Sequence, residues 1–134
     1  MSYLLDTDVL IELERRTPQA LFAQVSAHAG QLFVSSISVA ELQFGVAKSR
    51  NPAHMREALE ALLTQLNILD FTTQDAVHAG EIRESLRREG KPIGPNDMLI
   101  AAQALTRGLV MVTGNTREFS RVAGLRVENW LEGN

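Results

Sequence analysis

Carboxylate side chains stand at three places along the chain where a predicted strand ends or a predicted helix begins. Asp6 follows a short apolar run, Glu41 lies early in a helix, and Asp97 lies in the first turn of a later helix. Clustered carboxylates repel one another strongly unless they hold protons or bind a divalent cation. Oxygen ligands with water completing the coordination shell suit Mg²⁺, with Mn²⁺ as a plausible substitute. These three acids are therefore a candidate metal site.

The elements that must position these acids alternate between strands and helices. Short apolar runs are separated by stretches with helical spacing of apolar residues, and Gly90 and Gly108 are typical helix ends. Ser38 and Glu41 have the spacing of a capping box, which predicts that a helix begins at Ser38. The predicted strands are 3–5, 32–35, 68–71, 109–113 and 125–127, and the predicted helices lie near 9–13, 18–29, 38–48, 53–66, 73–89 and 95–107, with a short one from about 116.

This alternation predicts an α/β fold with a mainly parallel central sheet that helices cover on both faces. The carboxyl ends of parallel strands share one edge of the sheet, where Asp6 and Glu41 then lie. Asp97 returns to that edge because its helix runs antiparallel to the strand that follows it. Asn115 and Glu118 come directly after that strand and reach the same edge. Open α/β sheets bind their ligands at this edge.

Each acid also has a purely structural interpretation. Glu41 and Glu118 can complete capping boxes, while Asp6 and Asp97 can serve as a helix cap and a first-turn acid. Capping does not require the acids to meet. Their predicted convergence on one edge favours a functional cluster.

Composition restricts the kind of protein and the chemistry available to it. A chain of 134 residues fits a single domain spanning 1–134, and with no cysteine it has neither disulfides nor thiolate ligands. Neither an export signal nor an apolar run long enough to span a bilayer is visible, so we expect a cytoplasmic protein without membrane contact. The formal net charge is −3, but residues 81–134 carry 8 Lys/Arg against 7 Asp/Glu. A phosphate-binding surface is therefore expected mainly from the later part of the chain.

Four motifs in order carry a resemblance to a known family. They are LDTD at 5–8, SISVAEL at 36–42, PIGPND at 92–97 and VTGNTREF at 112–119. In this order and spacing they resemble the PIN-domain ribonucleases, specifically the VapC toxins of bacterial toxin-antitoxin systems. The resemblance runs from Leu4 to Trp130, nearly the whole chain.

The resemblance implies a PIN-like three-layer α/β/α sandwich and a hydrolase activity. The expected reaction is Mg²⁺-dependent endonucleolytic hydrolysis of RNA, with a 5′-phosphate left on the downstream fragment. Asp6 and Asp97 would be the primary metal ligands, and Glu41 would bind through water or accept the proton of the nucleophile. Thr113 would orient a carboxylate or a water through its hydroxyl group.

The position of a fourth acid departs from the family pattern. Many PIN domains have an acid where this chain has Asn115, which supplies no charge. Glu118, one helical turn further along, is the possible substitute in the catalytic site. Asp8 stands where the family often has Asn, and we expect it to support the site rather than bind metal directly.

Cations near the acids are candidates for binding RNA, whose backbone must approach a negative site. Arg83, Arg87 and Lys91 recur at four-residue spacing, and Arg117 lies after the last buried strand. The alternative is that Arg83 and Arg87 pair with acids of their own helix, Glu84 and Glu81. Aromatic residues make up only 5% of the chain, which favours recognition of a structured RNA such as tRNA over base stacking.

The resemblance also implies partners: a VapB-like antitoxin that covers the acidic site, and a second copy of the chain in a homodimer. Apolar residues around Phe44, Leu59, Leu62 and Leu63 are candidates to line a groove for a partner helix. Two other functions stay open. A catalytically degenerate PIN-like binding module is compatible with Asn115, whereas a receiver-like phosphoacceptor would need a lysine that is missing after 109–113.

Overall fold

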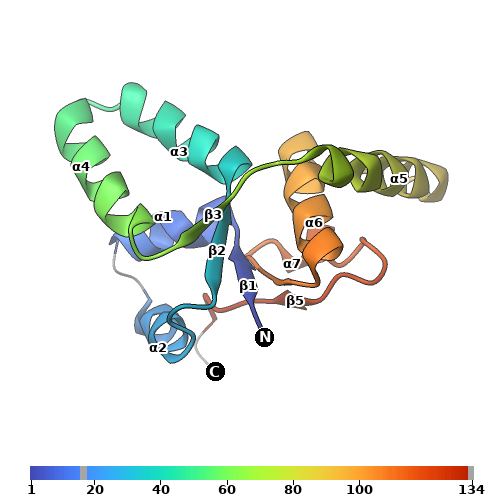
Figure 1. The fold of residues 1–134 in the computed structure, drawn as a ribbon, viewed down its shortest axis with the longest axis horizontal. Helices are drawn as coiled ribbons and strands as arrows, with labels where there is room; N and C mark the ends of the chain where they lie inside the picture. Colours follow the sequence, from blue (N-terminus) through green and yellow to red (C-terminus); the bar gives the residue numbers. More distant parts are fainter. Residues whose placement is uncertain (16–17, 133–134) are drawn as a thin grey trace.

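The computed structural model describes residues 1–15 and 18–132, and within them five short strands form one parallel sheet in the order β3-β2-β1-β4-β5 (Figure 1). The strands are β1 (Tyr3–Leu5), β2 (Leu32–Ser35), β3 (Asn67–Leu69), β4 (Val110–Val112) and β5 (Val127–Glu128). The helices are α1 (Thr7–Arg15), α2 (Gln19–Ala27), α3 (Ser36–Ala47), α4 (Pro52–Leu63), α5 (Thr73–Glu89), α6 (Pro95–Arg107) and α7 (Thr116–Phe119). The predicted α/β class and parallel sheet are confirmed.

Helices cover both faces of the sheet and form the outer layers of an α/β/α sandwich. Helices α1 to α4 pack on one face, and α5 to α7 pack on the other (Figure 1). The central strand β1 serves both cores because successive side chains point to opposite faces: Tyr3 and Leu5 enter the first core, and Leu4 enters the second. Since both faces are buried, β1 is apolar throughout, as is typical of parallel strands.

Strand pairing aligns the carboxyl ends that carry the site. Leu5 at the end of β1 is in register with Val112 at the end of β4, and Ser35 at the end of β2 is in register with Leu69. The residues that follow β1, β2 and β4 therefore emerge along one edge. Within the described ranges, no helix is long and apolar enough to cross a membrane.

Local signals account for the two helices of the second layer. Helix α5 begins with a complete capping box between Thr72 and Asp75, and it ends at Gly90, whose φ of 68° is left-handed. Helix α6 begins at Pro95, where the missing N–H costs nothing, and it ends at Gly108 in the same left-handed region. Both helices match the predicted bounds.

The predicted start of α3 was wrong. Helix α3 begins at Ser36, because the side chain of Ser35 accepts a hydrogen bond from the Ile37 N–H at 3.0 Å and provides the cap. Ser38 and Glu41 therefore lie inside the helix, and Ser38 is fully buried. The capping-box interpretation of Glu41 is excluded, which leaves its carboxylate to be explained by the site.

Other predicted bounds shift by a few residues. Strand β3 ends at Leu69, since the Phe71 N–H donates to the side chain of Ser36 at 3.2 Å and so leaves the sheet. Strand β5 begins later than predicted, because the Leu125 N–H closes a turn onto the carbonyl of Val122 at 3.2 Å. Helix α4 ends at Leu63, three residues earlier than expected.

Candidate active site

Asp6 is the most deeply placed acid of the site. It follows β1, is 6% exposed, and its two oxygens accept hydrogen bonds from the Thr7 N–H and the Thr113 hydroxyl, both at 2.8 Å. Its pKa is raised from 3.8 to about 7, because burial and, to a smaller extent, the charges of Asp8 and Asp97 outweigh the two hydrogen bonds, which lower it. Thr113 thus orients this carboxylate, as predicted for its hydroxyl group.

Glu41 reaches the site from one turn inside α3 and is held there by α1. The Thr7 hydroxyl donates to Glu41 Oε1 at 2.8 Å and lies 2.9 Å from the hydroxyl of buried Ser38. These contacts join residues 31 and 34 positions apart, so the pairing of Thr7 with α3 has no local signal in the sequence. Thr7 and Ser38 are positioning residues; the sequence patterns singled out Ser38 only as a helix cap and did not single out Thr7.

Asp97 lies in the first turn of α6, half-buried and facing the other acids. Burial, followed by the neighbouring carboxylates of Glu118, Glu41 and Asp8, raises its pKa from 3.8 to about 6. A Cβ at Gly94, the residue before the helix, would lie 3.4 Å from Asp97 Oδ2, which is an ordinary van der Waals contact, so this carboxylate packs closely against the start of α6. The structure therefore brings all three predicted ligands, Asp6, Glu41 and Asp97, toward one edge.

Asn115 and Glu118 join this edge as a hydrogen-bonded pair. Asn115 Nδ2 donates to Glu118 Oε2 at 2.7 Å, and Glu118 raises the pKa of Asp97 more than any other neighbouring charge does. Asn115 occupies the N-cap position of α7, but its side chain makes no capping hydrogen bond. The capping-box interpretation of Glu118 is therefore wrong, and its carboxylate lies beside Asp97 instead. We name Asp6, Asp8, Glu41, Asp97 and Glu118 the acidic cluster.

Asp8, in helix α1, is hydrogen-bonded to the loop that follows β4. Its Oδ2 accepts the Gly114 N–H at 3.0 Å, while Oδ1 is buried without a hydrogen-bond partner among the described residues. Burial raises its pKa above the ordinary value. A Cβ on Gly114 would lie 2.7 Å from Asp8 Oδ2 and 2.9 Å from the side chain of Leu131, so only glycine permits this approach. The contact agrees with the supporting role predicted for Asp8.

The donors of the acidic cluster fit a divalent cation. Within residues 1–15 and 18–132, no three acid or histidine side chains are already arranged as a complete metal site. The cluster nevertheless consists of hard carboxylate oxygens, one of them buried and unpartnered in Asp8, and burial together with mutual repulsion raises the pKa of Asp6 and Asp97. A cation would satisfy these oxygens and remove the repulsion that now favours protons.

The predicted RNA-binding cations differ in how they are held. Arg87 forms two hydrogen bonds with Glu84 at 2.7 and 2.9 Å, so the predicted alternative of an intrahelical pair is correct for Arg87. Arg83 is exposed and pairs with no acid within the described residues, so the same alternative is wrong for it. Lys91 is exposed in the loop after α5, and Arg117 is exposed on α7 directly before Glu118.

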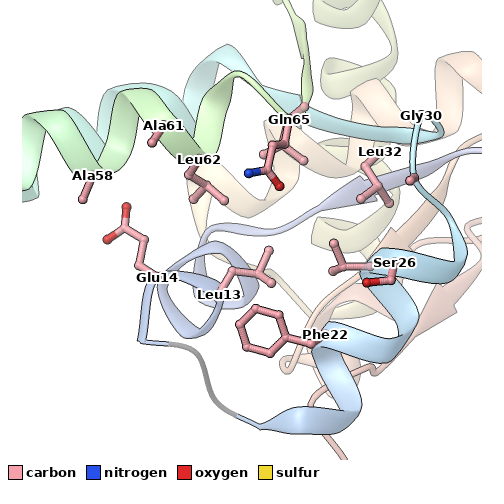
Figure 2. Close-up of a pocket in the computed structure, with 13 residues that line it drawn as sticks. Leu13, Glu14, Phe22, Ser26, Gly30, Leu32, Ala58, Ala61, Leu62 and Gln65 are labelled. Atoms are coloured by element: carbon pink, nitrogen blue, oxygen red, sulfur yellow. The ribbon is translucent and has the colours of Figure 1, made fainter.

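A separate apolar cavity of about 640 Å³ lies between α1, α2 and α4 (Figure 2). Leu13, Phe22 and Leu62 point into it from the three helices, and Glu14 stands at one side. Of the residues predicted around a partner groove, Phe44, Leu59, Leu62 and Leu63, only Leu62 lines this cavity. Leu59 is fully buried in the core, and Phe44 is 66% exposed on α3.

Known proteins resemble this chain over nearly its full length. Residues 3–125 match the family model of the PIN domain. Ribonuclease VapC2 of Haemophilus influenzae is 43% identical over 98% of this chain and 99% of its own, and the tRNA(fMet)-specific endonuclease VapC of Shigella flexneri is 38% identical over 97% and 98%. The structure of DNA-bound VapBC from Salmonella typhimurium superposes with a TM-score of 0.93 at 38% identity, covering 97% of this chain and 98% of that one.

These relatives agree with the geometry of the site and decide between the open interpretations. The receiver-like alternative is wrong, because the match to the PIN domain covers the strands and helices that carry the acids. PIN-domain nucleases generally depend on divalent metal ions, in agreement with the carboxylate donors gathered here. The chain belongs to the PIN-domain family and is an endoribonuclease of its VapC toxin branch.

Proposed function

We propose that this chain hydrolyses RNA phosphodiester bonds at the acidic cluster, with Asp6, Glu41 and Asp97 holding Mg²⁺ and with Mn²⁺ able to replace it. The observation that carries the proposal is the convergence of carboxylates from α1, α3, α6 and α7 beside the buried Asp6, and the raised pKa of Asp6, about 7, and of Asp97, about 6, agrees with it. A structural role would be better served by uncharged residues, because burying repelling carboxylates costs stability. Such a cost is typical of functional sites.

The surrounding residues assign a task to each carboxylate. When bound, the divalent ion would supply positive charge for the phosphate and lower the pKa of the attacking water. Thr7 and Thr113 fix the orientation of the Asp6 carboxylate through their two hydrogen bonds and partly oppose the rise in its pKa. The Thr7 hydroxyl holds Glu41 by Oε1, which leaves Oε2 to accept the proton of the water. Glu118 stands beside Asp97 as the fourth acid, oriented by Asn115.

A structured RNA, with tRNA as the first candidate, is the proposed substrate. The relative from Shigella flexneri is named for action on tRNA(fMet), and it is 38% identical to this chain. Exposed Arg83, Lys91 and Arg117 lie on elements that lead to or follow the acidic cluster, where they offset its repulsion of the RNA backbone.

The cavity between α1, α2 and α4 is the proposed seat of an antitoxin segment. The relatives of known structure from Salmonella typhimurium and Rickettsia felis are VapBC complexes. Leu13, Phe22 and Leu62 offer apolar contacts to such a segment, and Glu14 offers a negative charge to a basic residue beside it. The segment would continue over the acidic cluster and exclude RNA.

We propose further that the chain acts in the cytoplasm, as a single domain spanning 1–134, and forms a homodimer. Phe44 on α3 is 66% exposed and Val77 on α5 is 56% exposed, which are large apolar surfaces to leave in water. Light scattering after gel filtration should report a dimer for the wild type and a monomer for Phe44→Ser. A monomeric wild type would contradict the dimer without affecting the nuclease proposal.

The decisive experiment is cleavage of total RNA and of tRNA by the purified protein with Mg²⁺, with Mn²⁺ and with chelator. Asp6→Asn and Asp97→Asn should abolish cleavage, and the exposed Asp70→Asn should leave it unchanged. Identical fragments from wild type and from the first two variants would refute the site. Metal binding by the wild type without cleavage of any RNA would favour a degenerate binding module instead.

A further inference from the structure

A second hollow lies between the end of α5 and the start of α6. Its volume is about 610 Å³, within the range of roughly 300–1,000 Å³ that is typical of small-ligand sites. Leu86, Ile93 and Met98 give it an apolar lining, and the exposed arginines Arg83 and Arg87 border it. This combination of apolar lining and cationic border differs from the antitoxin cavity, which carries a glutamate.

The hollow and the acidic cluster share one wall. Pro95 and Met98, from the first turn of α6, line the hollow. Asp97 lies between them in the sequence, yet its carboxylate interacts electrostatically with Glu118 and Glu41 of the acidic cluster. A ligand in the hollow is therefore separated from the proposed cleavage site only by the first turn of α6.

The two arginines at the border differ in their freedom. Arg87 is fixed by its two hydrogen bonds with Glu84, which neutralises much of its charge. Arg83 lies one helical turn earlier on the same side of α5 and, among the described residues, pairs with no acid. A guanidinium with free donors binds phosphate through paired hydrogen bonds and also stacks on flat rings.

The loop that completes the hollow is fixed before any ligand binds. Gly90 ends α5 in the left-handed region with φ 68°, which turns the chain back over the helix. Arg121 Nη1 then donates to the carbonyl of Pro92 at 2.8 Å and anchors the loop to the segment after α7. A preformed site binds its ligand without the cost of ordering a loop.

We propose that this hollow is a subsite for one unpaired nucleotide of the RNA, next to the phosphate that is cleaved. The base packs against Ile93 and Met98, and its phosphate contacts Arg83. The proposal rests on the nuclease function proposed above, and it adds a second place, outside the acidic cluster, where the protein binds the RNA. Apolar contacts of this kind accept any base, because they meet its face rather than its hydrogen-bonding edge.

Steady-state cleavage of an RNA oligonucleotide that the wild type cuts tests the role of Arg83. Arg83→Gln should raise KM about 10-fold, leave kcat within about 2-fold, and reduce the salt dependence of binding by about one phosphate contact. Arg88→Gln is the matched control, because Arg88 is an equally exposed arginine of α5 that pairs with Glu84 and does not line the hollow. It should leave both constants and the salt dependence unchanged.

Removal of the base tests the apolar part of the subsite. An abasic nucleotide placed in turn at each position flanking the cut should raise KM about 10-fold at one position for the wild type. Ile93→Glu should raise KM for the intact RNA, and KM for the abasic RNA should then be no higher than KM for the intact RNA. Ile68→Glu, at an exposed isoleucine of β3, is the control, and thermal unfolding shows that each variant is folded.

The results separate failure of the subsite from failure of the nuclease proposal. Equal kinetics for Arg83→Gln and Arg88→Gln, or equal abasic penalties in the wild type and Ile93→Glu, would overturn the subsite while metal-dependent cleavage stands. Cleavage that survives Asp6→Asn would overturn the nuclease proposal instead. If Arg83→Gln weakens antitoxin binding but leaves RNA kinetics unchanged, the hollow is a protein interface and the subsite is refuted.

Discussion

Replacing Asp6 with asparagine should stabilise the metal-free protein, and only at the higher pH values. The pKa of Asp6 is about 7 in the folded chain and 3.8 ordinarily, because burial and neighbouring acids disfavour its charge. Between about pH 5 and pH 7 the unfolded chain has therefore lost this proton while the folded chain keeps it. Stability falls as pH rises through this window, the reverse of the behaviour of a salt-bridged carboxylate.

The size of the effect follows from the linkage relation. Each pH unit in the window costs about 1.4 kcal/mol, so two units remove about 2.7 kcal/mol from the wild type between about pH 5 and pH 8. Asp6→Asn has no proton to lose and does not share this loss. For a chain of this length the difference corresponds to roughly 10 °C in melting temperature.

The assay is denaturant unfolding of wild type and Asp6→Asn in chelator at about pH 5 and about pH 8. The advantage of the variant should grow by about 2–3 kcal/mol between the two conditions, whatever its hydrogen bonds to Thr7 and Thr113 cost at either pH. Asp70→Asn, at an exposed aspartate, should show no such growth. Saturating Mg²⁺ should raise the stability of the wild type at about pH 8 and have little effect on Asp6→Asn. Parallel pH dependence of wild type and variant would refute the reasoning.

Three further substitutions, the first with a control, test the site and the framework of the fold. Gly114→Ala places a Cβ 2.7 Å from a carboxylate oxygen, so it should cost about 1–3 kcal/mol of stability and most of the activity. Gly45→Ala, at an open position of α3, should gain about 0.5–1 kcal/mol of stability. Equal melting temperatures for these two variants would contradict the prediction. Glu118→Gln should lower metal-dependent cleavage about 10- to 100-fold at limiting Mg²⁺, and unchanged activity would remove it from the site. Arg107→Ala removes the guanidinium that lies 2.6 Å from the fully buried carboxylate of Asp75. The free energy of unfolding, measured with denaturant, should fall by about 3–5 kcal/mol. A fall of less than about 1 kcal/mol would contradict the prediction.

Much of the fold was predictable because its signals are local. The apolar strands, the left-handed glycine after α5 and the proline at the start of α6 each act within a few residues. The convergence of Asp6, Glu41 and Asp97 was also predictable, since parallel strands with helical crossovers bring their carboxyl ends to one edge. Topology thus supplied the neighbourhood of the site without any knowledge of its contacts.

The supporting contacts were not predictable, because they join distant parts of the chain. Thr113 bonds Asp6 across 107 residues, and Gly114 bonds Asp8 across 106. The start of α3 was misplaced for a related reason. The local spacing predicted Ser38 as the cap, but Ser38 is buried in contact with Thr7, and the side chain of Ser35 caps the helix instead. Local patterns cannot rank such candidates when a distant partner decides between them.

The order of the strands in the sheet has a consequence for the synthesis of this enzyme. Strand β1 is made first but lies in the middle of the sheet, between β2 and β4. A nascent chain that has emerged as far as Gly90 carries Asp6 and Glu41, yet it lacks Asp97 and the strand that precedes Thr113. The proposed site is thus complete only when the last third of the chain has been made and folds against the first strand.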